Sequence, residues 1–120
     1  MHADFIDPTK AQIYVPWFFA VWGVICLSGL AFFTFNRDAA LKRRVFLPML
    51  LFSDVVFLGF LLLVGTPREF LLVAVPMLAL ITVLNLRAVR FCDGCGRTLH
   101  SQNPFSVPRF CSKCGAPITP

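Results

Sequence analysis

Residues 92–115 read CDGCG RTLHSQNPFSVPRF CSKCG and contain two Cys-x-x-Cys-Gly motifs. Fifteen residues separate Cys95 from Cys111, a spacing typical of metal sites with four thiolate ligands. The predicted ligands are Cys92, Cys95, Cys111 and Cys114. Two disulfides are the alternative in an oxidising compartment, but metal ligation at a reducing face is far more usual for this spacing. Because four cysteines complete a tetrahedron, we expect a closed structural site rather than a catalytic one.

The chain before these motifs is strongly apolar. Of its 120 residues, 58% are hydrophobic and 14% are charged, and the mean hydropathy is +0.77. Soluble domains contain about 45–50% apolar residues, so this composition indicates a small integral membrane protein with a short polar appendix. The net charge of +5 would favour nucleic acid or anionic lipid in a soluble protein. In a membrane protein, the placement of the charges matters more than their sum.

Three apolar runs are long enough to cross a bilayer as helices, and they are Trp17–Phe35, Val45–Val64 and Phe70–Leu86. A run of nineteen residues spans about 28 Å as a helix, close to the thickness of the hydrocarbon core. Short polar segments join the runs, so we predict an all-α membrane domain of three antiparallel transmembrane helices over residues 17–86. Met1–Pro16 is predicted to be a polar tail outside the cytoplasm; it lacks the features of a signal peptide, so we expect it to be retained.

Aromatic and basic residues suggest where the membrane surfaces lie. Tyr14, Trp17 and Trp22 gather near the start of the first run, and such amphipathic rings favour the headgroup level. Between the first two runs, Lys42, Arg43 and Arg44 are expected to fix topology and to touch anionic headgroups.

The distribution of Lys and Arg predicts the orientation. Two of these residues, Lys10 and Arg68, lie on the side away from the cysteine motifs. Nine lie on the side of the motifs: Arg37, Lys42, Arg43, Arg44, Arg87, Arg90, Arg97, Arg109 and Lys113. The positive-inside rule therefore places the N-terminus outside and the cysteine motifs in the cytoplasm, as expected for the plasma or inner membrane. Thiolates also stay reduced in the cytoplasm.

Asp54 lies in the middle of the second run. A carboxylate at that depth costs about 2.5–3.5 kcal/mol, so it should face protein or water rather than lipid. By depth, Ser28 of the first run is the expected hydrogen-bond donor, while Thr82 and Asn85 lie nearer the cytoplasmic surface. Three roles remain open: a structural hydrogen bond within the bundle, a polar contact with another subunit, and a proton or ion pathway.

The last part of the chain, residues 87–120, is predicted to be a small β-hairpin domain. Its thirty residues after Arg90 are too few to bury a self-sufficient core, and a bound metal can supply the missing folding energy. We expect Arg97–His100 and Phe105–Phe110 to pair as a short hairpin around residues 101–104. Only Arg87–Arg90 separates the third helix from the first motif, without Gly, Ser or Pro, so the domain should sit at the membrane surface.

The two stretches FCDGCGRTL and RFCSKCGAPI resemble the short zinc-ribbon family, over about the last quarter of the chain. This resemblance implies one structural zinc ion, held by Cys92, Cys95, Cys111 and Cys114. It implies no single function, because zinc ribbons serve nucleic-acid, protein-contact and purely structural roles. Rubredoxin-like iron is also bound by two such motifs, but that family has a longer spacer. The resemblance does not extend to the membrane part.

Basic side chains near the motifs, His100 and Cys26 also have expected roles. Four thiolates and Zn²⁺ carry a formal charge of −2, which nearby basic side chains can offset. His100 is expected to be a surface residue, because four cysteines already complete the metal site. Cys26, the fifth cysteine, lies in an apolar run and is expected to be a small buried hydrophobic residue.

These observations favour a non-enzymatic function. The sequence has no Ser/His/Asp set, no phosphate-binding loop and no open metal site. The leading hypothesis is an accessory or scaffold protein of the membrane, whose zinc ribbon contacts a membrane-protein partner or a larger complex at the cytoplasmic face. The alternatives are a membrane-tethered zinc ribbon that binds nucleic acid and, less favoured, a rubredoxin-like electron-transfer protein.

Overall fold

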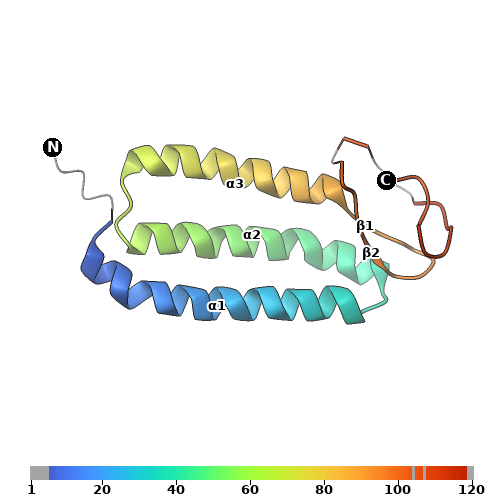
Figure 1. Ribbon diagram of the computed structural model, residues 1–120, viewed down its shortest axis with the longest axis horizontal. Coiled ribbons are helices and arrows are strands. Elements are labelled where there is room, and N and C mark those ends of the chain that lie inside the picture. Colours follow the sequence, from blue (N-terminus) through green and yellow to red (C-terminus); the bar gives the residue numbers. More distant parts are fainter. Residues whose placement is uncertain (1–5, 104, 107, 119–120) are drawn as a thin grey trace.

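The computed structural model describes residues 6–103, 105–106 and 108–118. Within this part of the chain, three long helices precede a small two-stranded sheet and the cysteine cluster (Figure 1). The elements are α1 (Pro8–Phe35), α2 (Ala39–Leu63), α3 (Arg68–Ala88), β1 (Val89–Phe91) and β2 (Thr98–His100). Each helix is long and apolar enough to cross a membrane. The predicted fold class is therefore confirmed.

The helices extend beyond the apolar runs at their N-terminal ends. α1 starts at Pro8 rather than at Trp17, because Asp7 caps it by accepting a hydrogen bond from the backbone N–H of Thr9 at 3.0 Å. The expected polar tail is thus helical from Pro8 onward, and its first five residues lie outside the described part. α2 starts at Ala39, where the Asp38 carboxylate caps the helix, so the basic segment 42–44 belongs to its first turns.

The three helices form one layer with α2 in the middle (Figure 1). α1 and α3 lie on opposite sides of α2, and the molecule measures 59 × 27 × 20 Å. Because α2 separates its two neighbours, most apolar side chains of α1 and α3 remain on the outside of the protein. This arrangement suits a lipid environment, where such side chains need no protein cover.

Trp22 lies in the contact between α1 and α2. Its ring is 5.1 Å from that of Phe18, which in turn stacks on Phe60 at 4.1 Å. The indole Nε1 donates a hydrogen bond to Ser53 Oγ at 3.0 Å. An indole N–H needs such a partner when it leaves water, and Ser53 supplies it inside the bundle. Trp17, by contrast, stays exposed.

The sheet differs from the expected hairpin. β2 pairs with β1 in antiparallel register, with Arg90 opposite Leu99, and not with residues 105–110. Phe110 instead forms an isolated bridge with Pro117. The reason is local, because each Cys-x-x-Cys-Gly turn reverses the chain and brings together the residues that flank it. Residues 104 and 107 of the predicted hairpin lie outside the described part.

An aromatic cluster joins the sheet to the helices. The ring of Phe91 lies parallel to that of Phe33 at 5.7 Å and edge-on to that of Phe46 at 5.5 Å. Ala39, Val89 and Phe91 are buried, and the two helical phenylalanines pack against them. Burial of a large aromatic side chain contributes about 1.5–3 kcal/mol, so this cluster anchors the sheet to α1 and α2.

A buried lysine makes the polar counterpart of this contact. The side chain of Lys42 is 1% exposed, and its Nζ donates to the carbonyl oxygens of Phe33 and Gly96, both at 2.7 Å. It also donates to Thr98 Oγ1 at 3.2 Å. The expectation that Lys42 touches lipid headgroups is therefore wrong. Its side chain instead joins α1, α2 and the cysteine domain.

Arg43 adds a second polar link. Its Nη2 donates to Asp93 Oδ2 at 2.9 Å and to the carbonyl oxygen of Phe91 at 3.1 Å. Two of the three basic residues in the segment 42–44 thus hold the cysteine domain, whereas Arg44 is exposed. The domain is fixed to the ends of the helices and does not hang from a flexible linker.

The close fit at Gly96 generates a prediction. Gly96 and Gly115 both have a positive φ, of 68° and 71°, which costs a non-glycine residue roughly 1–2 kcal/mol. A Cβ at Gly96 would overlap the carbonyl of Arg37, whereas a Cβ at Gly115 would meet nothing within 4 Å. Gly96→Ala should therefore destabilise the protein by about 1–3 kcal/mol more than the matched control Gly115→Ala.

Thermal unfolding in detergent measures this difference. Hydrogen exchange should also increase over residues 33–46 in Gly96→Ala but not in Gly115→Ala, because only the first substitution separates the domain from the helices. Equal effects of the two substitutions would contradict the close contact with Arg37.

Candidate metal centre

The cysteine domain contains two turns of the same construction. In the first, Gly96 N–H donates to the carbonyl oxygen of Cys92 at 2.9 Å. In the second, Gly115 N–H donates to the carbonyl oxygen of Cys111 at 3.0 Å. The positive φ of each glycine allows this tight turn, which points both cysteine side chains of a motif to the same side. Cys111 follows Cys92 by nineteen positions, so the domain is an internal repeat.

The flanking hydrogen bonds repeat as well. Cys92 N–H donates to the carbonyl oxygen of Arg97 at 3.0 Å, and Cys111 N–H donates to that of Ala116 at 2.9 Å. Gly94 lets the two turns approach each other, since a Cβ there would lie 3.0 Å from the Cβ of Ala116 and 3.3 Å from Cys114 Sγ. This role of Gly94 could not be predicted from the sequence, because it depends on the position of the second turn.

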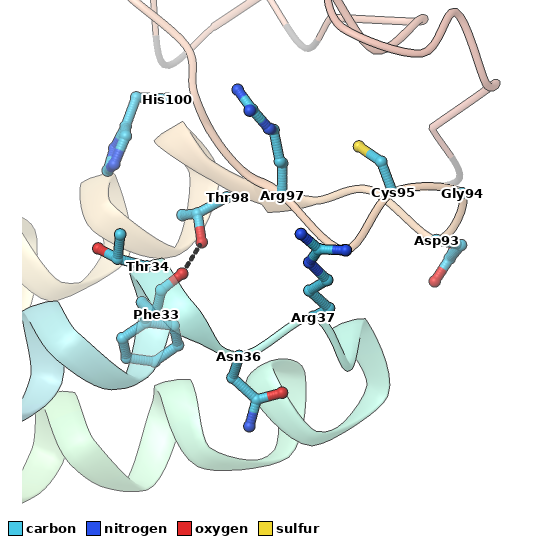
Figure 2. A pocket seen from close by; sticks show the side chains of 11 residues that line it. Phe33, Thr34, Asn36, Arg37, Asp93, Gly94, Cys95, Arg97, Thr98 and His100 are labelled. Carbon is cyan, nitrogen blue, oxygen red and sulfur yellow. Dashed lines mark hydrogen bonds between the residues drawn. The ribbon is translucent and has the colours of Figure 1, made fainter.

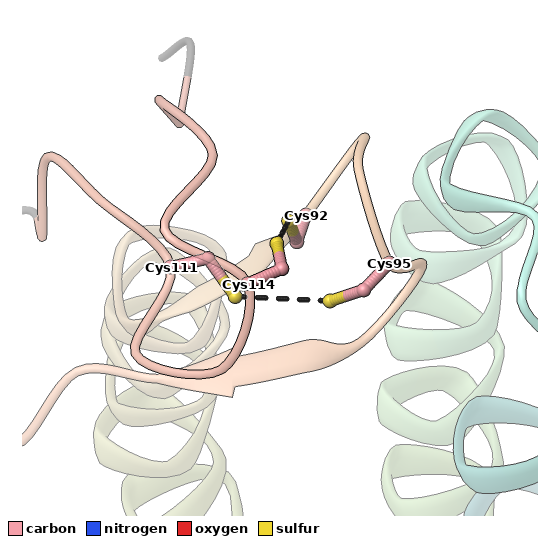
Figure 3. A group of neighbouring side chains, drawn as sticks. All are labelled: Cys92, Cys95, Cys111 and Cys114. Carbon is pink, nitrogen blue, oxygen red and sulfur yellow. Dashed lines mark hydrogen bonds between the residues drawn. The ribbon is translucent and has the colours of Figure 1, made fainter.

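The four sulfur atoms of the predicted ligands converge (Figure 3). All of them lie within 4.8 Å of one another; Cys92 Sγ is 3.4 Å from Cys114 Sγ, and Cys95 Sγ is 3.7 Å from Cys111 Sγ. Four sulfurs placed tetrahedrally at 2.3 Å from one ion would be about 3.8 Å apart. The cluster therefore has the donor atoms and the dimensions to hold one metal ion, and the cysteines are free rather than paired as disulfides.

The pKa values of two of the sulfurs are shifted in opposite directions. Hydrogen bonds from the backbone N–H groups of Cys114 and Lys113 lower the pKa of the Cys111 thiol to about 6, which favours its thiolate. The backbone N–H of Ala116 acts in the same direction on Cys114, but the neighbouring sulfur of Cys92, followed by burial, outweighs it and raises that pKa to about 12. A divalent ion must displace this proton to gain four thiolates, so metal affinity should rise with pH.

The other sequence candidates lie outside this cluster. His100 is exposed, as expected, and is not among the clustered ligands. Cys26 is exposed on the outer surface of α1, so the expectation that it is buried was wrong. Because α1 packs on one side only, an apolar position within it need not face another helix.

Asp54 has a defined partner within the bundle. Thr82 Oγ1, on α3, donates a hydrogen bond of 2.6 Å to Asp54 Oδ2, and Thr82 is buried. Ser28, the expected donor, instead bonds to the carbonyl oxygen of Ile25 in its own helix. The expectation that Ser28 donates to Asp54 was wrong. It was based on depth in the membrane alone, and depth does not tell which face of α2 meets α3. The contact agrees with a structural role for Asp54.

Comparisons of this chain with protein-family models, with curated proteins and with solved structures found no match. The resemblance to zinc ribbons therefore rests on the cysteine motifs and stays a prediction. What the structure adds is the convergence of the four ligands and their attachment to the membrane helices.

The metal centre leads to a prediction about individual cysteines. Cys111→Ser should abolish the binding of one metal ion per chain and unfold the cysteine domain, because a structural metal of this kind contributes on the order of 10 kcal/mol. Cys26→Ser, the matched control on α1, should keep full metal content. Elemental analysis of the purified protein, with amide exchange over residues 89–118, measures both effects. Full metal content in Cys111→Ser would contradict the four-cysteine site.

The contact of Asp54 leads to a second prediction. Thr82→Val keeps the side-chain shape but removes the donor, and should destabilise the protein by about 1–3 kcal/mol, because the half-buried carboxyl of Asp54 loses its partner. Ser28→Ala removes a hydroxyl that bonds only within its own helix, so its effect should stay below about 0.5 kcal/mol. Thermal unfolding of both variants in the same detergent tests this, and equal midpoints would refute the interhelical bond.

Proposed function

We propose that this chain is a non-enzymatic accessory protein of the cytoplasmic membrane, in which a zinc-loaded ribbon docks a protein partner at the cytoplasmic face. The choice of zinc is supported by the donor set, since four thiolates in a tetrahedral arrangement are the usual environment of structural zinc. Such a site leaves no open coordination position, which supports a structural rather than a catalytic role. The excess of Lys and Arg at the ribbon end supports its placement in the cytoplasm.

The observation that carries the proposal is a difference between the two repeated turns. Phe91 and Phe110 occupy equivalent positions, each directly before the first cysteine of its motif and each opposite the residue seven positions later. Phe91 is 5% exposed, because α1 and α2 cover it, whereas Phe110 is 65% exposed. The second turn thus presents to the outside the same kind of surface that the first turn uses to bind helices. Phe105 is exposed nearby.

Exposed aromatic side chains on a rigid support are typical of interface anchors. The ribbon is rigidly supported, since Lys42 and Arg43 hold it to the helices. Because Lys42 is buried and Arg43 is paired with Asp93, less cationic surface remains that would favour nucleic acid. A protein partner that covers Phe110 is therefore the function we favour.

The test is gentle purification of the tagged full chain, followed by mass spectrometry of co-isolated proteins and metal analysis of the same sample. Phe110→Ser should weaken the binding of the specific partner by about thirtyfold, because loss of a central aromatic anchor costs about 2 kcal/mol. Arg44→Ala, an exposed substitution at the same end of the bundle, should leave partner binding unchanged. Both variants should keep their metal.

Two results would overturn the proposal. One is a clean monomer without companions in the wild-type preparation. The other is a partner that binds equally well to the wild type and to Phe110→Ser.

A further inference from the structure

Two cavities meet where the cysteine domain joins the helices. The first, of about 810 Å³, lies between the end of α1 and the first cysteine turn (Figure 2). The second, of about 350 Å³, is an apolar groove that runs along α1 and α2 toward the middle of the bundle. Phe33, Thr98 and His100 line both cavities, so the two are adjacent, and together they are called the crevice here, with a polar and an apolar end.

The polar end carries two guanidinium groups from separate segments. Arg37 follows the end of α1, and Arg97 follows the first cysteine turn (Figure 2). Asp93 also lines this cavity, but its carboxylate is paired with Arg43 at 2.9 Å. Arginine is suited to phosphate, because its planar group offers several donors in a fixed geometry. This end of the crevice therefore has the charge and the donors to bind a phosphate group.

The apolar end has the dimensions of one membrane leaflet. Along α1 the groove extends from Ile25 to Phe33, a distance of about 12 Å, whereas half of the hydrocarbon core is about 15 Å thick. Gly29 forms part of its wall and packs closely on α2, since a Cβ there would lie 3.1 Å from Met49 Sδ. The groove lies on the outer surface of the bundle and reaches Phe33, in the last turn of α1.

We propose that this crevice binds one phospholipid with an anionic headgroup. Arg37 and Arg97 hold the phosphate at the membrane surface, and one acyl chain lies in the groove between Ile25 and Phe33. The adjacency of a polar and an apolar cavity favours this ligand, because a free phosphate would fill only the polar end and a neutral apolar molecule only the groove. This site is separate from the protein contact proposed at Phe110.

The first test compares headgroups. The purified full chain in neutral detergent is titrated with phosphatidylglycerol or phosphatidylcholine of the same acyl chains, and bound lipid is counted by native mass spectrometry. Phosphatidylglycerol should bind at least five times more tightly. Replacing both arginines, as Arg37→Ala with Arg97→Ala, should weaken it about twenty-five-fold, since each charge near an anionic headgroup contributes about fivefold. Arg44→Ala, whose arginine lines neither cavity, should change the affinity less than twofold.

The second test addresses the acyl chain. Leu27 and Leu30 are equally exposed on α1, at 68% and 67%, but only Leu30 lines the groove. Leu30→Trp fills the groove and should weaken phosphatidylglycerol binding at least fivefold, whereas the matched control Leu27→Trp should not. The metal content of each variant is measured on the same sample, to show that the cysteine domain is intact.

Each remaining outcome overturns the proposal. The phosphate site would be contradicted if the two lipids bound equally well. It would also be contradicted if the double arginine variant and Arg44→Ala had equal effects. Equal effects of Leu30→Trp and Leu27→Trp would contradict the binding of an acyl chain in the groove. Displacement of the lipid by millimolar glycerol phosphate would show that the crevice recognises a free phosphate compound rather than a lipid.

Discussion

The ammonium group of Lys42 is the interaction on which the arrangement of this protein depends. It is almost completely buried and donates to three acceptors, which belong to α1 and to two positions of the cysteine domain. A buried charge costs several kcal/mol unless hydrogen bonds compensate it. Because all three acceptors are needed, the end of α1, the start of α2 and the first cysteine turn are held in one geometry.

This constraint makes the metal centre part of the membrane domain. Phe91 fills the space between α1 and α2, and Gly96 allows its turn to approach Arg37. A metal ion bound by the cysteine cluster would therefore also stabilise a surface against which the helices pack. The same attachment makes the two repeated turns unequal, since it buries Phe91 and leaves Phe110 outside.

The basic residues near the membrane surface divide into groups with different tasks. Lys42 is buried and Arg43 is paired with Asp93 at the surface, and both hold the domain, whereas Arg37 and Arg97 line the crevice. A net charge of +5 is thus a poor guide to a partner, because some of these charges already have partners inside the protein.

The number of membrane helices and the four metal ligands could be predicted from the sequence, since both depend on spacing along a short stretch. The partners of Trp22, Lys42 and Asp54 could not, because they depend on how each helix is rotated and which neighbour it meets. The strand pairing failed for a related reason, as the turn that closes it is formed by the cysteine motif itself. Sequence alone determined the apolar segments and the ligand set; tertiary structure decided that the metal domain is fixed to the helices, because only packing buries Lys42.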